Sequence, residues 1–260
     1  MDLSQFDVNF RLFGVPVRIM PSFWLLTLLF SPFLTRTPGG EEQPWIFGAF
    51  GWMLAVALSF LFHEFGHALS ARKLLGASPS VEFGIGSGRS GAFVFGGITS
   101  WSYQRSGLEP WRRVVVSVAG PLAATGASLL FVAIAALCGN SILWSFLYGF
   151  LPIPIPVDWM ILTKGPTPGA LFWGYFVYGF VWIGIVWSAF NLLPIYPLDG
   201  SRVSAWIFDG RWGGRRTSYG VSAAVAALLT VFYLSSRQFF MAYMFGFMAY
   251  SSYQAYRALS

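Results

Sequence analysis

Residues 45–69 read WIFGAFGWMLAVALSFLFHEFGHAL, an apolar run that carries three titratable side chains near its end: His63, Glu64 and His67. A helix of about 20 apolar residues crosses a bilayer, so this run is long enough to span one. The whole chain has the same character, because 56% of its 260 residues are hydrophobic and only 10% are charged. An ordinary soluble domain has roughly 25% charged residues. The sequence therefore predicts an integral, multi-pass α-helical membrane protein.

About six transmembrane helices are expected, joined by short connections within a single domain that covers residues 1–260. A seventh apolar stretch, residues 142–157, is interrupted by Pro152, Pro154 and Pro156. Because prolines break a helix, we expect a partial or re-entrant helix there. The six expected spans are residues 21–34, 45–69, 114–137, 170–193, 219–234 and 239–256.

Two segments between the expected spans favour β-structure. Residues 8–19 alternate and are rich in β-forming side chains, which indicates an extended segment. In residues 78–106, glycines alternate with phenylalanine and valine, which favours short strands and turns. The sequence therefore predicts a small membrane-associated sheet in which the two segments pair.

The two histidines of the chain, His63 and His67, flank Glu64 in the second span. Four residues apart on a helix, two imidazoles project from one face and can offer two nitrogens to one Zn²⁺. The carboxylate of Glu64 lies next to the open coordination position, where it can take a proton from zinc-bound water. The alternative is that the three groups form structural hydrogen bonds between helices. Polar groups clustered in apolar surroundings need a compensating partner, however, and a divalent cation supplies one.

A catalytic zinc has three protein ligands and leaves its fourth position to water. No histidine remains and Cys138 is the single cysteine, so a carboxylate near a span is expected as the third ligand. The best candidate is Asp199, in the segment NLLPIYPLDG at 191–200. Pro194 and Pro197 open the backbone there, and irregular backbone at membrane depth lines a cavity or is buried in protein. The alternative role of Asp199 is to cap a helix that begins near residue 201.

Together, HEFGH at 63–67 and NLLPIYPLDG at 191–200 resemble the paired motifs of the site-2 protease family of intramembrane zinc metalloproteases. The segment FGVPVR at 13–18, the glycine-rich strands and AGPL at 119–122 are also similar to elements of that family. The resemblance implies that His63, His67 and Asp199 bind one Zn²⁺ per chain and that Glu64 is the catalytic base. It also implies hydrolysis of peptide bonds in or near transmembrane segments of other membrane proteins.

Residues 123–125 differ from the family pattern, and the roles of Gly120 and Asn191 need separate consideration. After AGP at 119–121, many members of the family place an asparagine, where this chain has AAT at 123–125. For Gly120 we expect close helix packing through a small residue. Asn191 either contacts the substrate backbone or the developing oxyanion, or it stabilises the proline-broken segment by a hydrogen bond.

Two modules found in some members are not expected. The connection between residues 72 and 112 is too short for a PDZ insertion. Few residues follow the last expected span. We therefore expect a minimal form, with neither a PDZ domain nor a C-terminal nucleotide-sensing domain.

The basic residues predict the orientation in the membrane. Thirteen of the 16 Lys and Arg residues fall on one side of a six-span arrangement, and Arg36, Lys164 and Arg237 fall on the other. The positive-inside rule makes the first side cytoplasmic, with both termini and the opening of the site on it. The basic residues are dispersed among loops rather than clustered in a stripe, so no nucleic acid is expected as a partner. The apolar spans predict that a lipid bilayer surrounds the chain.

Two other functions use the same side chains. A zinc transporter would need a polar route to both faces of the membrane, but residues 25–30 and 170–181 offer no charged group. A catalytically inactive relative would bind membrane helices without cutting them, and the complete set of His63, Glu64, His67 and Asp199 argues against it.

Overall fold

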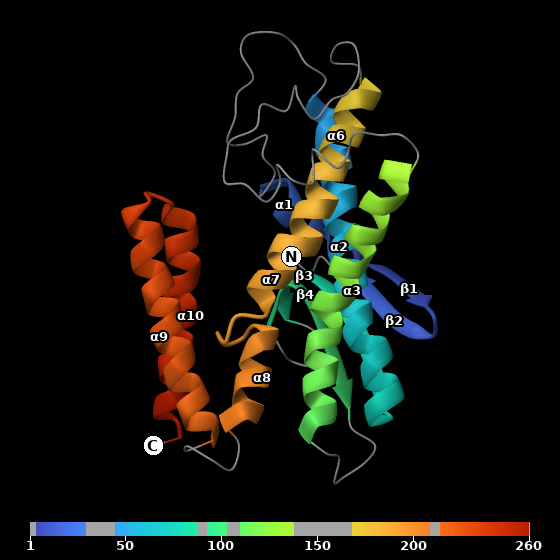
Figure 1. The fold of residues 1–260 in the computed structure, drawn as a ribbon. Helices are drawn as coiled ribbons and strands as arrows, with labels where there is room; N and C mark the ends of the chain where they lie inside the picture. Colours follow the sequence, from blue (N-terminus) through green and yellow to red (C-terminus); the bar gives the residue numbers. More distant parts are fainter. Residues whose placement is uncertain are drawn as a thin grey trace.

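The structure is a computed structural model that describes residues 4–29, 45–87, 93–102, 110–137, 168–208 and 214–259 (Figure 1). It is mostly helical and contains one four-stranded sheet. The elements, in chain order, are η1 (Ser4–Phe6), β1 (Val8–Leu12), β2 (Val15–Ile19), α1 (Pro21–Leu29), α2 (Trp45–Leu75), β3 (Ser78–Ser87), β4 (Phe93–Ser102), α3 (Pro110–Leu137), α6 (Pro168–Val181), the π-helix η3 (Trp182–Trp187), α7 (Ser188–Asn191), α8 (Asp199–Phe208), α9 (Gly214–Ser235) and α10 (Phe239–Arg257).

Four helices of the described part are long and apolar enough to cross a membrane: Ile46–Leu75, Trp111–Ile134, Phe172–Asn191 and Gly214–Ser235. These confirm four of the six expected spans. The first expected span is described only through the end of α1. The last corresponds to α10, which is 19 residues long but is not among the four helices that are apolar enough to cross. The predicted re-entrant segment, residues 142–157, lies outside the described residues. The chain is thus a polytopic helical membrane protein.

The expected extended segment at residues 8–19 is a hairpin rather than one strand. β1 and β2 pair in antiparallel register, and Leu12 faces Val15 across a two-residue turn. Both turn residues, Phe13 and Gly14, have positive φ angles, as the common two-residue hairpin turn requires. The guanidinium of Arg72, near the end of α2, donates to the Phe13 carbonyl over 2.7 Å and so ties the hairpin tip to this helix.

The predicted pairing of the two β-rich segments is confirmed. The sheet order is β1-β2-β3-β4, in which β2 and β3 run parallel and β3 and β4 run antiparallel. β1 and β4 are therefore the edge strands among the described residues. The helix α2 packs on this sheet through a buried core that comprises Val15, Val17, Phe23, Trp52, Val56, Phe65, Ala68, Val81 and Phe83. The sheet thereby flanks the half of α2 that carries the histidines.

The fourth expected span changes character along its length. It begins as α6, continues as the π-helix η3 and the short α7, and ends before Pro194. Carbonyl oxygens at this irregular stretch accept hydrogen bonds from α3. Ser128 donates to the Phe180 carbonyl over 2.8 Å, and Thr125 donates to the Gly184 carbonyl over 3.0 Å. Thr125, in the stretch where many site-2 proteases place an asparagine, thus stabilises the π-helical segment.

The contact between α2 and α6 gives a test of the helix packing. A Cβ at Gly51 would overlap the backbone carbonyl of Phe172, so we predict that Gly51→Ala forces α2 and α6 apart. Overpacking of this kind costs about 1–3 kcal/mol, which lowers the midpoint of thermal unfolding followed by circular dichroism in detergent.

Gly126→Ala is the matched control, because a Cβ at Gly126 on α3 meets nothing within 4 Å. Alanine is the better helix former, so this variant should unfold at the wild-type temperature or slightly above it. Equal midpoints for Gly51→Ala and wild type would contradict the packing described here.

Candidate metal centre

The two histidines lie one turn apart on α2 and point to the same side. His63 is 7% exposed and His67 is 4% exposed, so both rings are buried. Their Nε2 atoms are 3.2 Å apart. This is the geometry that the four-residue spacing predicts, since residues i and i+4 share a helix face.

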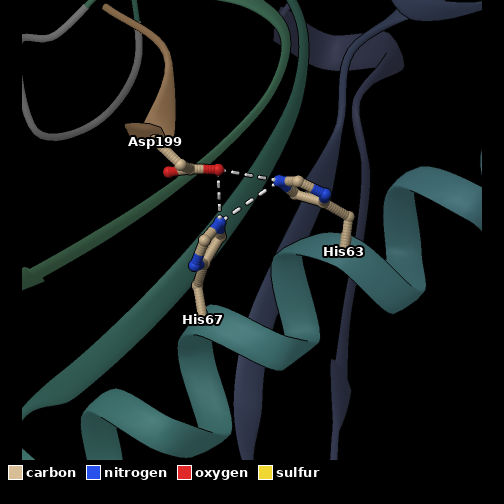
Figure 2. A group of neighbouring side chains, drawn as sticks. All are labelled: His63, His67 and Asp199. Carbon is tan, nitrogen blue, oxygen red and sulfur yellow. Dashed lines mark hydrogen bonds and ion pairs between the residues drawn. The ribbon is translucent and has the colours of Figure 1, made fainter. Parts of the chain in front are cut away.

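Asp199 brings a third donor atom to the same point from the far end of the sequence. It is the first residue of α8, and its Oδ2 atom lies 3.1 Å from Nε2 of His63 and 3.1 Å from Nε2 of His67 (Figure 2). The alternative role as a helix cap is therefore not its main contact, because Oδ2 faces the histidines.

A hydrogen bond fixes which nitrogen of His67 is free to bind a metal. The Nδ1 atom lies 2.7 Å from the Val116 carbonyl oxygen on α3, so Nδ1 carries a proton and donates it. In a neutral ring the lone pair is then on Nε2, which faces the other two donor atoms. Metal-binding histidines commonly have this second hydrogen bond, which sets the tautomer and the orientation of the ring.

The three donor atoms fit a divalent cation. They form a nearly equilateral triangle with sides of 3.1–3.2 Å, and such a set of electron-rich atoms is repulsive without a positive charge between them. Ligand atoms around a tetrahedral Zn²⁺, with bonds of about 2.0–2.1 Å, are about 3.3 Å apart. His63, His67 and Asp199 are also the group among the described residues whose ligand atoms lie close enough together to hold a metal ion. Two nitrogens and one carboxylate suit zinc well.

The His67 ring packs directly against Gly120 on α3. A Cβ at Gly120 would overlap the imidazole of His67, and a Cβ at Gly66 would overlap the Ala119 carbonyl. The expected close packing at Gly120 is therefore present, and it lies directly against a candidate ligand. α3 thus supplies no ligand, but its Val116 carbonyl accepts a hydrogen bond from His67 and its Gly120 leaves room for the His67 ring.

Glu64 is 5% exposed and lies against β4 rather than between the histidines. The hydroxyl of Thr99 on β4 is 2.7 Å from Oε2 of Glu64 and 3.0 Å from its backbone carbonyl oxygen. The other carboxylate oxygen, Oε1, lies where a side chain at Gly97 would be, 2.8 Å from a Cβ built there. The sequence analysis did not identify Thr99 or Gly97, because a single threonine in a glycine-rich strand carries no sign of its partner on a distant helix.

Asn191 is the last residue of α7, eight positions before Asp199, and it is half-buried. Its side chain makes no hydrogen bond to another residue in the described parts of the chain. Among the residues that the structure describes, the stabilising hydrogen bond of the second interpretation is not seen, and the substrate contact remains a prediction.

Comparison with known proteins gives consistent matches. The sequence model of peptidase family M50 matches residues 51–234. A Synechocystis protein designated a candidate zinc metalloprotease, sll0528, is 30% identical over 199 residues, which are 74% of this chain and 41% of that protein. The candidate zinc metalloprotease Rip3 of Mycobacterium tuberculosis is 27% identical over 218 residues, which are 82% of this chain and 46% of Rip3. The chain thus spans less than half of the length of the curated relatives it matches.

A solved structure has a similar fold. The site-2 protease from Methanocaldococcus jannaschii superposes with a TM-score of 0.51 and 16% identity, and the match covers 96% of this chain and 95% of that one. At this identity the match is informative about the fold.

The contact between Gly120 and His67 can be tested by metal binding. We predict that Gly120→Ala weakens zinc binding about 10- to 100-fold, the usual effect of disturbing a group that orients a ligand. The reason is that the added methyl group displaces the His67 imidazole. Competition with a chromogenic chelator, on purified protein in detergent, measures the affinity.

Gly126→Ala, on the same helix but in open space, should bind zinc as wild type does. A Gly120→Ala variant with wild-type affinity would show that the close contact does not position the ligand.

Proposed function

The chain belongs to peptidase family M50, and from this premise we propose that it is an intramembrane zinc metalloprotease that hydrolyses peptide bonds in or near transmembrane segments of other membrane proteins. One observation carries the proposal. Three donor atoms from His63, His67 and Asp199 lie 3.1–3.2 Å apart. The two histidines and the buried carboxylate of Glu64 belong to a helix long and apolar enough to span a membrane.

In the proposed mechanism, His63, His67 and Asp199 hold one Zn²⁺ per chain. When bound, the metal would polarise the scissile carbonyl and make a water acidic enough to react at neutral pH. The buried Val116 carbonyl keeps the proton of His67 on Nδ1 and so keeps Nε2 available as a ligand. Asp199 contributes a negative charge that offsets part of the charge of the cation.

Glu64 is proposed as the general base. Thr99 donates a hydrogen bond to Oε2 and holds the carboxylate in one orientation. The remaining oxygen, Oε1, accepts the proton of the attacking water and later passes it to the leaving amine. Gly97, without a side chain, leaves room for the carboxylate to lie against β4 in this orientation.

The substrate is proposed to bind as an extended strand. An intact helix hides its carbonyl groups, so a transmembrane substrate has to unwind locally before cleavage. Within the glycine-rich segment, β3 is paired on both sides whereas β4 is an edge strand of the described sheet. The open edge of β4 can take an added strand, and the same strand carries Thr99 beside Glu64. Asn191, whose amide has no partner among the described residues, is proposed to contact the substrate backbone.

The proposed orientation places both termini and the opening of the site in the cytoplasm. The carboxyl ends of α2, α8 and α10 and the amino ends of α3 and α9 lie at one end of the molecule, at the bottom of Figure 1. The turn between α9 and α10, which contains Arg237, lies at the opposite end of that hairpin. Positive charge favours the cytoplasmic side. The basic residues in the terminal turns at these ends are Arg72 and Lys73 of α2, Arg112 and Arg113 of α3, Arg215 and Arg216 of α9, and Arg257 of α10.

Replacement of Glu64 separates catalysis from metal binding. We predict that Glu64→Gln retains zinc but abolishes cleavage, because an amide of the same shape cannot accept the proton. The measurements are the zinc content of the purified variant and a comparison of membrane proteomes from cells with wild type and with Glu64→Gln. Transmembrane fragments that appear only with wild type would identify the substrate. Cleavage by the purified variant would eliminate Glu64 as the base, and zinc flux through wild type in vesicles without any cleavage would favour a transporter instead.

The hydrogen bond from Thr99 provides a second prediction. Thr99→Val keeps the shape of the side chain but loses the donor, and a hydrogen bond to a charged group contributes about 1.5–3 kcal/mol. We therefore expect kcat to fall about tenfold or more, with KM and zinc content unchanged. Thr99→Ser keeps the hydroxyl and should restore most of the rate, so equal defects in the two variants would contradict this role.

A further inference from the structure

The segment that presents Asp199 cannot satisfy its own backbone groups. Residues 192–198 join α7 to α8 and contain Pro194 and Pro197, which have no N–H group to donate. Short turns supply part of the hydrogen bonding, with Ile195 N donating to the Leu193 carbonyl over 2.7 Å and Leu198 N donating to the Ile195 carbonyl over 2.7 Å. The Pro194 carbonyl and the Tyr196 N–H group are left over. Within a membrane protein such groups need a partner from another element.

A single hydroxyl on α9 satisfies both groups. Ser222 is fully buried, and its Oγ donates to the Pro194 carbonyl over 2.8 Å and accepts from the Tyr196 N–H group over 3.3 Å. Between these two points, Ile195 is also fully buried and packs against Ala226 on α9 and Phe245 on α10. A second buried hydroxyl, Ser252 on α10, donates to the Tyr196 carbonyl over 3.5 Å. The proline-containing segment is thus held by the hairpin of α9 and α10 through two hydroxyls and the Ile195 side chain, and Ser222 makes the shorter of the hydroxyl contacts.

A second contact lies on the other side of Asp199. Ser204 on α8 and Ser218 on α9 are buried, and their hydroxyl oxygens are 2.7 Å apart. In Figure 1 the hairpin of α9 and α10 stands beside α8, away from α2 and α6. α8 also packs against α3. Asp199 therefore lies between two polar contacts with α9, at Ser222 and at Ser218.

The segment is too tightly folded to move independently of Asp199. A Cβ at Gly200, the residue after Asp199, would overlap the carbonyl groups of Leu192 and Leu193. The start of α8 is therefore packed on the start of the segment, with no space between them. A shift at Pro194 or Tyr196 has to shift Asp199 with it, and displaced ligands bind a metal less tightly.

We propose that Ser222 is a positioning residue for the third metal ligand, so that the α9–α10 hairpin, which supplies no ligand, nevertheless controls the affinity of the site. The inference rests on the proposed function only in taking His63, His67 and Asp199 as zinc ligands. Coupling of this kind is reciprocal, so metal binding must in turn stabilise the contact between the segment and α9.

The first test measures zinc affinity by competition with a chelator, on full-length protein in detergent. Ser222→Ala removes the hydroxyl, and we expect the dissociation constant for zinc to rise about 10- to 100-fold, as for other groups that orient ligands. Thr230→Val is the matched control, because the Thr230 hydroxyl on the same helix donates to the Ala226 carbonyl one turn away and to no other group in the described parts of the chain. The control should bind zinc within about twofold of wild type, and circular dichroism reports whether each variant keeps its helices.

The second test uses wild-type protein and does not depend on the folding of any variant. Hydrogen exchange is followed by mass spectrometry with zinc and with zinc removed by a chelator. We expect zinc to slow exchange in residues 192–200 and also in α9 around Ser222. In Ser222→Ala, zinc should still slow exchange in α2 around His63 and His67, but no longer in α9.

The outcomes separate this proposal from the proposed function. If wild type binds no zinc, the metal site itself is wrong and the proposed function fails with it. If wild type binds zinc, but Ser222→Ala binds equally tightly or zinc leaves exchange in α9 of wild type unchanged, the link to the hairpin is wrong while the metalloprotease proposal stands.

Discussion

The meeting of α2 and α8 at three electron-rich atoms is the constraint on which the rest of the arrangement depends. Two imidazole nitrogens and one carboxylate oxygen lie 3.1–3.2 Å apart, in a protein whose helices are otherwise apolar. Groups of this kind are costly at membrane depth unless each has a partner. The partners come from elements that bear no ligand: the Val116 carbonyl on α3 holds His67, and Ser222 on α9 holds the segment before Asp199. The helices thus surround one polar cluster, formed by His63, His67 and Asp199.

Glycines determine how closely the helices approach this polar cluster. At Gly66, Gly120 and Gly200 a single methyl group would overlap a backbone carbonyl or a candidate ligand. In lipid no hydrophobic effect draws helices together, so close packing through small residues has to supply the attraction. The same packing carries the chemistry here, because the face of α3 that admits α2 is the face that orients His67. Helix association and ligand geometry therefore depend on the same residues.

The sequence predicted the spans, the sheet and the candidate ligands because each has a local signal. Apolar length identifies a span, a four-residue spacing puts His63 and His67 on one face, and elimination of other ligands points to Asp199. The hairpin turn at Phe13 and Gly14 and the π-helix were not predicted. Each of these depends on contacts with distant elements, such as the hydrogen bond from Thr125 to the Gly184 carbonyl. For the same reason, Thr99 and Ser222 looked like ordinary polar residues until their partners were known.

The break in the fourth span explains why these hydroxyl groups are needed. A continuous helix satisfies its own backbone, but it cannot also bring an aspartate from its end to face histidines in the middle of α2. The chain departs from regular α-helical bonding at η3 and again between α7 and α8, and serine and threonine side chains on α3 and α9 accept or supply hydrogen bonds at these places. A hydroxyl is small, neutral and able both to donate and to accept, so it replaces a backbone partner without adding a charge to the protein interior. The irregular backbone and the buried hydroxyls are therefore two parts of one solution to presenting a carboxylate within a membrane.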